Sequence, residues 1–187
     1  MDEGTLPVEE RAPGSNRVGR ILWELAHDLA LAALLCYFLI SFVAQAFRVQ
    51  GTSMLPLLQD GERIIVDKLT YRFEPIRRGD VVVFWYPRDP TISFIKRIVA
   101  LPGETVEVKS GVVLIDGRAL SEDYIPPASR DQASHRPTRV PPGHYFVMGD
   151  HRTSSNDSRN WGEVPQKYIY GRALGRFWPL SKLGALP

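Results

Sequence analysis

Residues 80–101, DVVVFWYPRDPTISFIKRIVAL, contain two runs rich in Val and Ile that indicate β-strands. The first run covers Asp80–Trp85 and the second Ser93–Leu101, and the turn residues Arg78-Gly79 and Pro102-Gly103 flank the pair. Apolar runs of the same kind recur at residues 63–66, 105–109, 111–115, 144–148 and 168–177. The pattern predicts a mainly β fold.

The segment from about residue 105 to 143 is expected to be an insertion in this β domain. It begins with two short strands around Lys109-Ser110-Gly111, which predicts a hairpin with a tight turn. Glu122–Pro142 then holds five prolines and few apolar residues, so we expect a polar, partly extended loop there. A second polar loop, His151–Asn160, is expected to be held in place by the apolar residues that flank it.

An uncharged apolar run, Leu29–Phe47, precedes the β pattern. It is about as long as the roughly 20 residues that cross a bilayer as a helix, and we predict a transmembrane helix over it. Residues 1–28 would then form a cytoplasmic tail with an interfacial end, and residues 48–187 an extracytoplasmic β-rich domain, because Arg11, Arg17 and Arg20 precede the run.

Two other interpretations of the apolar run stay open. Ala44-Gln45-Ala46 is a small-x-small motif directly after its most apolar part, as in a cleavable signal peptide. The run could also be a helix in the core of a soluble protein, although it has no polar face.

Composition excludes several classes of function. The chain has 187 residues and a formal net charge of +2, and no Lys/Arg run resembles a nucleic-acid-binding arm, so we expect no nucleic-acid partner. Its single cysteine, Cys36, cannot form an intramolecular disulfide or a Cys-rich metal site. No metal or organic cofactor is expected.

Ser53 lies between Gly51 and Pro56 just after the apolar run, and its hydroxyl is a candidate nucleophile. Taken alone, this serine is better explained as a turn residue that caps a helix. A nucleophilic serine needs a base to take its proton. His144 and His151 are candidates, and Asp150 beside His151 would permit a Ser-His-Asp triad.

Lys96 is a third candidate base. Period-two alternation places it on one strand face with Ile92, Phe94 and Ile98, while Arg97 points to the other face. A lysine in an apolar row either extends to the surface or loses its charge, because desolvation lowers its pKa. A neutral amine near pH 7 is a competent general base for serine.

Four segments in this order resemble the conserved boxes of bacterial type I signal peptidases, which are membrane-anchored Ser/Lys proteases. They are Ser53-Met54-Leu55-Pro56, residues 78–84 (RGDVVVF), residues 94–104 (FIKRIVALPGE) and residues 149–162 (GDHRTSSNDSRNWG). With the apolar run included, the resemblance covers roughly residues 29–178.

The resemblance implies a role for each matching residue. It makes Ser53 the nucleophile and Lys96 the general base, and it makes Ser155 the hydroxyl that orients the lysine amine. Asp157 and Arg159 match a pair that braces the loop. Since no metal or cofactor takes part in this family's chemistry, the resemblance implies neither.

The resemblance also implies substrates and a location. The family removes signal peptides from secretory preproteins after Ala-x-Ala sites, at the extracytoplasmic face of the cell (inner) membrane and in contact with its lipid. Met54, Leu58 and Ile95 are the candidates to line the pockets for small side chains, with Phe47 and Val49 as less securely placed candidates.

Gly51 stands where some members carry a serine that helps to form the oxyanion hole, so we expect the Ser53 backbone N–H to be one donor. The Ala44-Gln45-Ala46 motif raises the separate hypothesis of self-cleavage before Phe47. The alternative from another class is a non-catalytic, membrane-tethered β-domain that binds an envelope partner.

Overall fold

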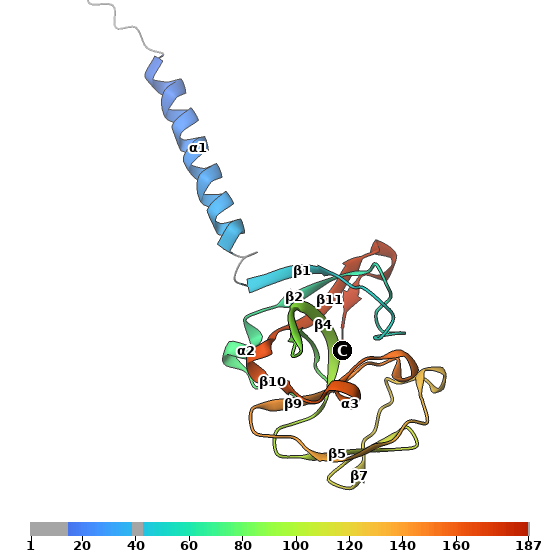
Figure 1. Cartoon of the computed structure of the whole chain (residues 1–187). Coiled ribbons are helices and arrows are strands. Elements are labelled where there is room, and N and C mark those ends of the chain that lie inside the picture. The colour runs from blue at the N-terminus through green and yellow to red at the C-terminus, as the bar shows by residue number, and fades with distance from the viewer. Residues whose placement is uncertain (1–14, 39–42, 187) are drawn as a thin grey trace, which may run out of the picture. The chain divides into compact units, whose positions relative to one another are not determined.

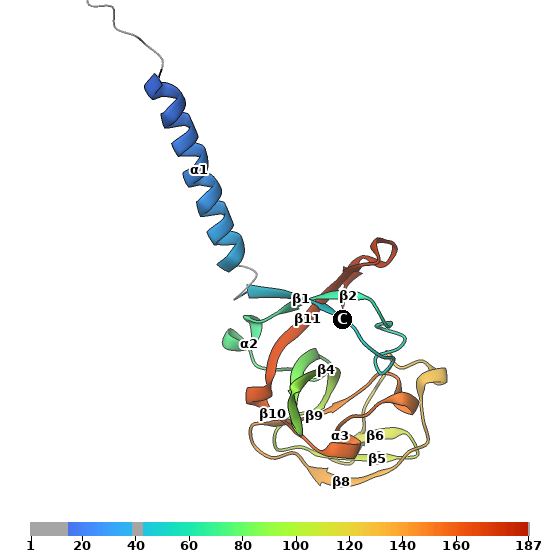
Figure 2. The same ribbon diagram turned by 45° about the horizontal axis from the view of Figure 1, so that its top comes forward.

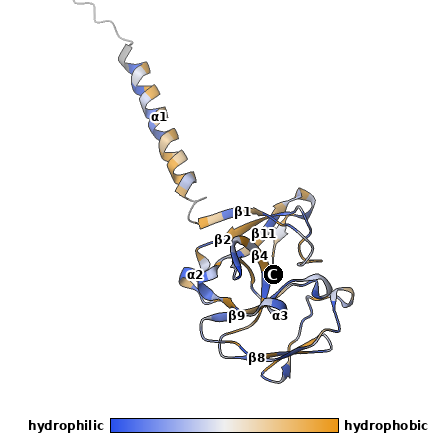
Figure 3. Cartoon of the chain, in the orientation of Figure 1, coloured by the Kyte–Doolittle hydropathy of each residue, from blue (hydrophilic) through white to orange (hydrophobic). Residues whose placement is uncertain are grey.

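The computed structural model describes residues 15–38 and 43–186, which fall into two compact units, residues 1–40 and residues 41–187. The first unit contains one helix, α1 (Ser15–Phe38) (Figure 1). Its segment Arg17–Phe38 is long and apolar enough to cross a membrane, and no residue of its most apolar stretch is buried. Hydrophobic residues cover most of the C-terminal half of α1 (Figure 3).

The predicted span of Leu29–Phe47 has the wrong boundaries. The helix begins earlier, at Ser15, and ends at Phe38, while residues 39–42 lie outside the described part of the chain. Ala44–Arg48 form a strand, β1, paired antiparallel with β2 (Arg63–Asp67). An apolar run does not by itself distinguish the end of a helix from a following strand, and pairing with β2 decides the difference.

The second unit is mainly β, as predicted. Its larger sheet has the order β1-β2-β11-β3-β4-β9-β10, with β12 paired to β11, and all neighbours are antiparallel. The bounds of the strands not yet given are β3 (Val81–Tyr86), β4 (Asp89–Ala100), β9 (His144–Met148), β10 (Val164–Pro165), β11 (Ile169–Trp178) and β12 (Gly184–Ala185).

A second sheet has the order β7-β6-β5-β8 and lies at the end of the domain away from β1 and β2 (Figures 1 and 2). Its strands are β5 (Thr105–Lys109), β6 (Val112–Ile115), β7 (Arg118–Ala119) and β8 (His135–Arg139). The helical turns of the domain are α2 (Thr70–Phe73), α3 (Ser158–Trp161) and the 3₁₀ turns Pro127–Ser129, Arg152–Ser154, Gln166–Tyr168 and Leu180–Lys182.

The insertion contains the predicted hairpin, but its Pro-rich part is more regular than expected. Residues 135–139 form strand β8, which pairs with β5. Pro137 is tolerated in it because β8 is the outer strand of its sheet, where a proline can sit without interrupting a ladder on both sides.

Strand β3 is buried on both faces, which explains its uninterrupted apolar sequence. Val81 and Val83 belong to one buried cluster, and Val82 and Phe84 belong to another on the opposite face. The first cluster also contains Val49, Met54, Leu58, Ile64, Val66 and Ala173. It therefore forms the apolar support on which the Ser53 segment rests.

Candidate active site

Ser53 lies in the loop between β1 and β2, and two hydrogen bonds and the conformation of a glycine fix that loop. Gly51 has φ +86°, a left-handed conformation that favours glycine, and its N–H donates to Asp60 Oδ1 at 2.8 Å. The backbone N–H of His151 donates to the Ser53 carbonyl at 3.0 Å. The nucleophile candidate is thus tied to the loop that follows β9.

Lys96 comes from β4, opposite Val82 of β3, and only 4% of it is exposed. Its Nζ lies 2.7 Å from Ser53 Oγ and donates to the Ile95 carbonyl at 3.0 Å. Burial lowers the pKa of Lys96 to about 8, although the charges of Asp157 and Asp150 partly oppose this shift. The lysine therefore stays inside the domain and extends toward Ser53, not toward the surface.

The histidines have other partners. His151 Nδ1 lies 3.2 Å from the Thr52 carbonyl, and His144 Nδ1 lies 3.0 Å from the Pro142 carbonyl. Both Asp150 oxygens accept hydrogen bonds from Arg97, at 2.9 and 2.7 Å. Within the described residues, neither imidazole is hydrogen-bonded to Ser53, so the geometry favours Lys96 as the base.

Ser155 lies close to Ser53 but is not bonded to Lys96. A Cβ atom placed on Gly149 would lie 2.3 Å from Ser155 Oγ and 2.4 Å from the Ser53 carbonyl oxygen, so both groups pack directly on Gly149. Ser155 Oγ is buried near Asp157, and its hydroxyl helps to keep the pKa of Asp157 low.

Asp157 and Arg159 form a buried pair that shapes this loop. Arg159 donates from Nε and Nη2 to the two Asp157 oxygens at 2.8 and 2.9 Å, and Asp157 also accepts the Gly149 N–H at 3.1 Å. Burial alone would raise the pKa of Asp157, but the hydrogen bonds and charge of Arg159 outweigh it and lower the pKa. Arg159 also reaches Asp131 of the insertion at 2.6 Å.

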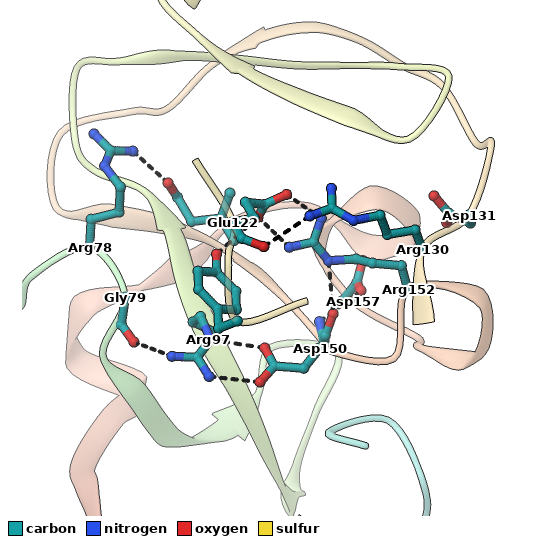
Figure 4. A network of polar contacts seen from close by, with 12 residues as sticks. Arg78, Gly79, Arg97, Glu122, Arg130, Asp131, Asp150, Arg152 and Asp157 are labelled. Atoms are coloured by element: carbon teal, nitrogen blue, oxygen red, sulfur yellow. Dashed lines mark hydrogen bonds and ion pairs between the residues drawn. The ribbon is translucent and has the colours of Figure 1, made fainter. Parts of the chain in front are cut away.

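A third buried ion pair was not anticipated from the sequence. Arg152 is bound by both carboxylate oxygens of Glu122, and its Nε donates to the Gly149 carbonyl at 3.0 Å (Figure 4). Tyr124 joins the network through a hydrogen bond to Glu122 and a face-on contact with the Arg97 guanidinium. The insertion is thereby fastened to the loop that carries Ser155.

A pocket of about 510 Å³ opens beside Ser53 and Lys96. Of the predicted pocket residues, Ile95 lines it, as do Phe47 and Val49. Met54 and Leu58 do not line it; they pack in the core beneath the loop. Further lining residues that the sequence did not indicate include Ile64, Val83 and Asn156.

Comparisons with known proteins assign the chain to a family. Residues 22–178 match the family model described as signal peptidase, peptidase S26. The chain belongs to this family. It is 40% identical to signal peptidase I of Leptolyngbya laminosa, over 96% of this chain and 91% of that protein. It is 46% identical to probable signal peptidase I-1 of Synechocystis sp., over 84% and 83% of the two chains.

A crystal structure of a signal peptidase I from Enterococcus faecalis V583 is 34% identical and covers 53% of this chain and 97% of that chain, with a TM-score of 0.47. Membership of the signal peptidase family makes the chain a serine-type endopeptidase and disfavours the non-catalytic binding domain. The matched range contains Ser53, Lys96 and Ser155.

Proposed function

We propose that this signal peptidase uses Ser53 as its nucleophile and Lys96 as its general base, and that it removes signal peptides from secretory preproteins. The 2.7 Å approach of Lys96 Nζ to Ser53 Oγ carries the proposal. Hydrogen-bond distance between nucleophile and base is the geometric requirement for this chemistry.

The reaction is an acyl transfer in two steps. Neutral Lys96 takes the Ser53 proton as Oγ attacks the scissile carbonyl carbon, and Lys96 then gives that proton to the leaving amine. A water molecule next gives a proton to Lys96 and attacks the acyl ester. The bond between the acyl carbon and Ser53 Oγ then breaks, Lys96 returns the proton to Oγ, and the signal peptide leaves with a free carboxyl group. Lowering the lysine pKa to about 8 makes the neutral amine available near physiological pH.

The Ser53 backbone N–H is the oxyanion donor that we propose. In the described part of the chain it has no hydrogen-bond acceptor, whereas the Gly51 N–H is occupied by Asp60. A donor of this kind contributes on the order of 10²–10³ in rate.

Ser155 is proposed to position the Lys96 amine during the reaction. Ser155 Oγ is buried, and buried hydroxyls are stabilised by hydrogen bonds, so a bond to the amine would be favourable once the Ser53 proton has moved. Asp157 and Arg159 are proposed as structural support for the loop.

Specificity for small-x-small sites is proposed to come from the walls of the catalytic pocket. Ile95, Val83 and Phe47 line the pocket next to the proposed dyad. The bulk of these three side chains would exclude large substrate side chains sterically.

Helix α1 is proposed to be a single membrane anchor with a cytoplasmic N-terminus and an extracytoplasmic catalytic domain. Such an anchor would keep Ser53 near the membrane surface, where the cleavage site of a signal peptide emerges. Self-cleavage after Ala46 is not proposed, because Ala44, Gln45 and Ala46 are paired with β2 in the folded domain.

Cleavage of a preprotein with an Ala-x-Ala site, by full-length chain in detergent, tests the proposal. Wild type should cut after the second Ala, as read by mass spectrometry, while Ser53→Ala and Lys96→Ala should lose at least about 10²-fold in rate. The exposed Lys167→Ala serves as the matched control and should cut normally. Undiminished cleavage by Lys96→Ala would rule out Lys96 as the general base and indicate a histidine in its place.

A further inference from the structure

A second pocket of about 520 Å³ lies next to the catalytic one. Its walls come from β1, the α2 segment, β3, β4 and β11, and α2 lies beside β11 (Figure 2). The lining residues are Gln45, Phe47, Lys68, Tyr71, Arg72, Trp85, Ser93, Ile169 and Tyr170. Signal peptide cleavage as proposed above uses none of its charged groups.

Two cations at this pocket lack a counter-ion. Within the described residues, neither Lys68 nor Arg72 forms an ion pair, while Asp67 and Asp80, which are close to them in the sequence, have other partners. Asp67 accepts hydrogen bonds from Leu69 and Thr70, and Asp80 accepts from the Tyr71 hydroxyl at 3.0 Å. The pocket therefore keeps a net positive charge and is suited to an anion.

The rest of the wall is aromatic. The rings of Trp85 and Tyr170 lie 5.0 Å apart, and those of Phe47 and Tyr170 lie 6.0 Å apart. Trp85 is 42% exposed, and Phe73, next to Arg72 in α2, is 81% exposed. Exposed aromatic side chains beside basic ones are typical of protein surfaces that meet lipid headgroups.

The chain connectivity sets where this pocket can lie. Gln45 stands only seven positions after Phe38, the last residue of α1, in the sequence. If α1 spans the membrane, as the proposed function states, the pocket stays within reach of the bilayer surface.

We propose that this pocket binds the phosphate group of an anionic phospholipid, with Lys68 and Arg72 as its cationic ligands and the aromatic wall against the glycerol and upper acyl chain. An apolar signal-peptide segment is a poor occupant, because it would desolvate both cations without pairing them. The two pockets share Phe47 and Ser93, so a lipid held here lies directly beside the catalytic pocket.

Native mass spectrometry of the full chain from neutral detergent micelles tests the assignment. The micelles contain equal amounts of phosphatidylglycerol and phosphatidylcholine, and the ratio of the two retained lipids is measured. Wild type should retain phosphatidylglycerol preferentially. Arg72→Gln should lower the preference about 5-fold, and the double variant Lys68→Gln/Arg72→Gln about 30-fold. The control Arg118→Gln/Arg136→Gln removes two exposed charges from the second sheet and should behave as wild type.

Three outcomes would overturn the proposal: equal retention of the two lipids by wild type, an unchanged preference in the double variant, or displacement of the lipid by millimolar inorganic phosphate. The last result would assign the pocket to a free anion. Normal preprotein cleavage by the double variant in neutral detergent verifies that it is folded.

Failure of the proposed peptidase function remains distinguishable. Ser53→Ala should lose cleavage and keep the lipid preference, since the lipid measurement does not depend on catalysis.

Discussion

Adding a methyl group at Gly149 tests how closely the Ser53 loop is held against the loop that follows β9. The new Cβ atom would lie 2.4 Å from the Ser53 carbonyl oxygen and 2.3 Å from Ser155 Oγ. Ordinary contacts between such atoms need about 1 Å more. Because one of the obstructing atoms is backbone, Gly149→Ala should push the Ser53 segment away.

The displacement should affect rate more than folding. A shift of about 1 Å at Ser53 breaks the 2.7 Å approach to Lys96, and misplacement on this scale costs on the order of 10²-fold in rate. Overpacking of this kind destabilises a domain by about 1–3 kcal/mol. We therefore expect kcat/KM for a preprotein to fall about 100-fold, while the domain stays folded at 25 °C by circular dichroism.

Gly184→Ala is the matched control, because a Cβ atom there meets nothing within 4 Å and its φ is not in the left-handed region. It should leave both rate and stability unchanged. A Gly149→Ala enzyme with the wild-type rate would refute the reasoning, since it would show that the Ser53 carbonyl is not fixed against Gly149.

Four further results are expected. The pH profile of kcat/KM should rise through about pH 8, because neutral Lys96 is the proposed base; a midpoint of 6–7 would indicate a histidine instead. Lys96→Met should abolish cleavage and stabilise the domain at pH 7 by up to about 3 kcal/mol in urea unfolding. The folded pKa of about 8 lies below the usual 10.5, so the folded state binds fewer protons between these values and the stability of the wild type rises with pH across that window. At pH 7, below both values, the full cost of burying the charged lysine is present, and Lys96→Met removes it. Glu122→Gln leaves the charge of Arg152 buried without its partner and should cost about 3–5 kcal/mol in the same assay, with an unchanged midpoint as the contrary result. Ile95→Ala enlarges the catalytic pocket and should raise cleavage after Val or Leu relative to Ala about 10-fold or more; unchanged selectivity would remove Ile95 from the specificity wall.

The strands of the domain were predictable because two local signals agree. Strand β3 forms where its Val-rich run predicts it, after the turn at Gly79. Strand β4 ends before the turn at Gly103 as predicted, but it begins at Asp89, earlier than the predicted Ser93. The alternation in β4 also separates Lys96 from Arg97, one toward Ser53 and the other toward Asp150. The alternation of side chains along a strand is therefore enough to predict that these two residues point to opposite faces.

Features that depend on contacts distant in the sequence were not predictable. β1 continues an apolar run and becomes a strand only through pairing with β2. Met54 and Leu58 are apolar residues near the nucleophile, but the turn that follows Ser53 directs them into the core. The ion pair of Glu122 with Arg152 joins two polar loops with no local pattern that relates them.

The buried ion pairs near Ser53 and Lys96 explain how an acidic environment coexists with a lysine of lowered pKa. Asp150 and Asp157 both act to raise the pKa of Lys96, and a free carboxylate at either position would favour the charged amine. Each is instead held by two hydrogen bonds from an arginine, Arg97 or Arg159, whose positive charge offsets that of the carboxylate at Lys96. The loop thus gains the rigidity of buried ion pairs, and the two carboxylates raise the pKa of Lys96 only in part. Desolvation of the lysine remains the dominant influence on its pKa.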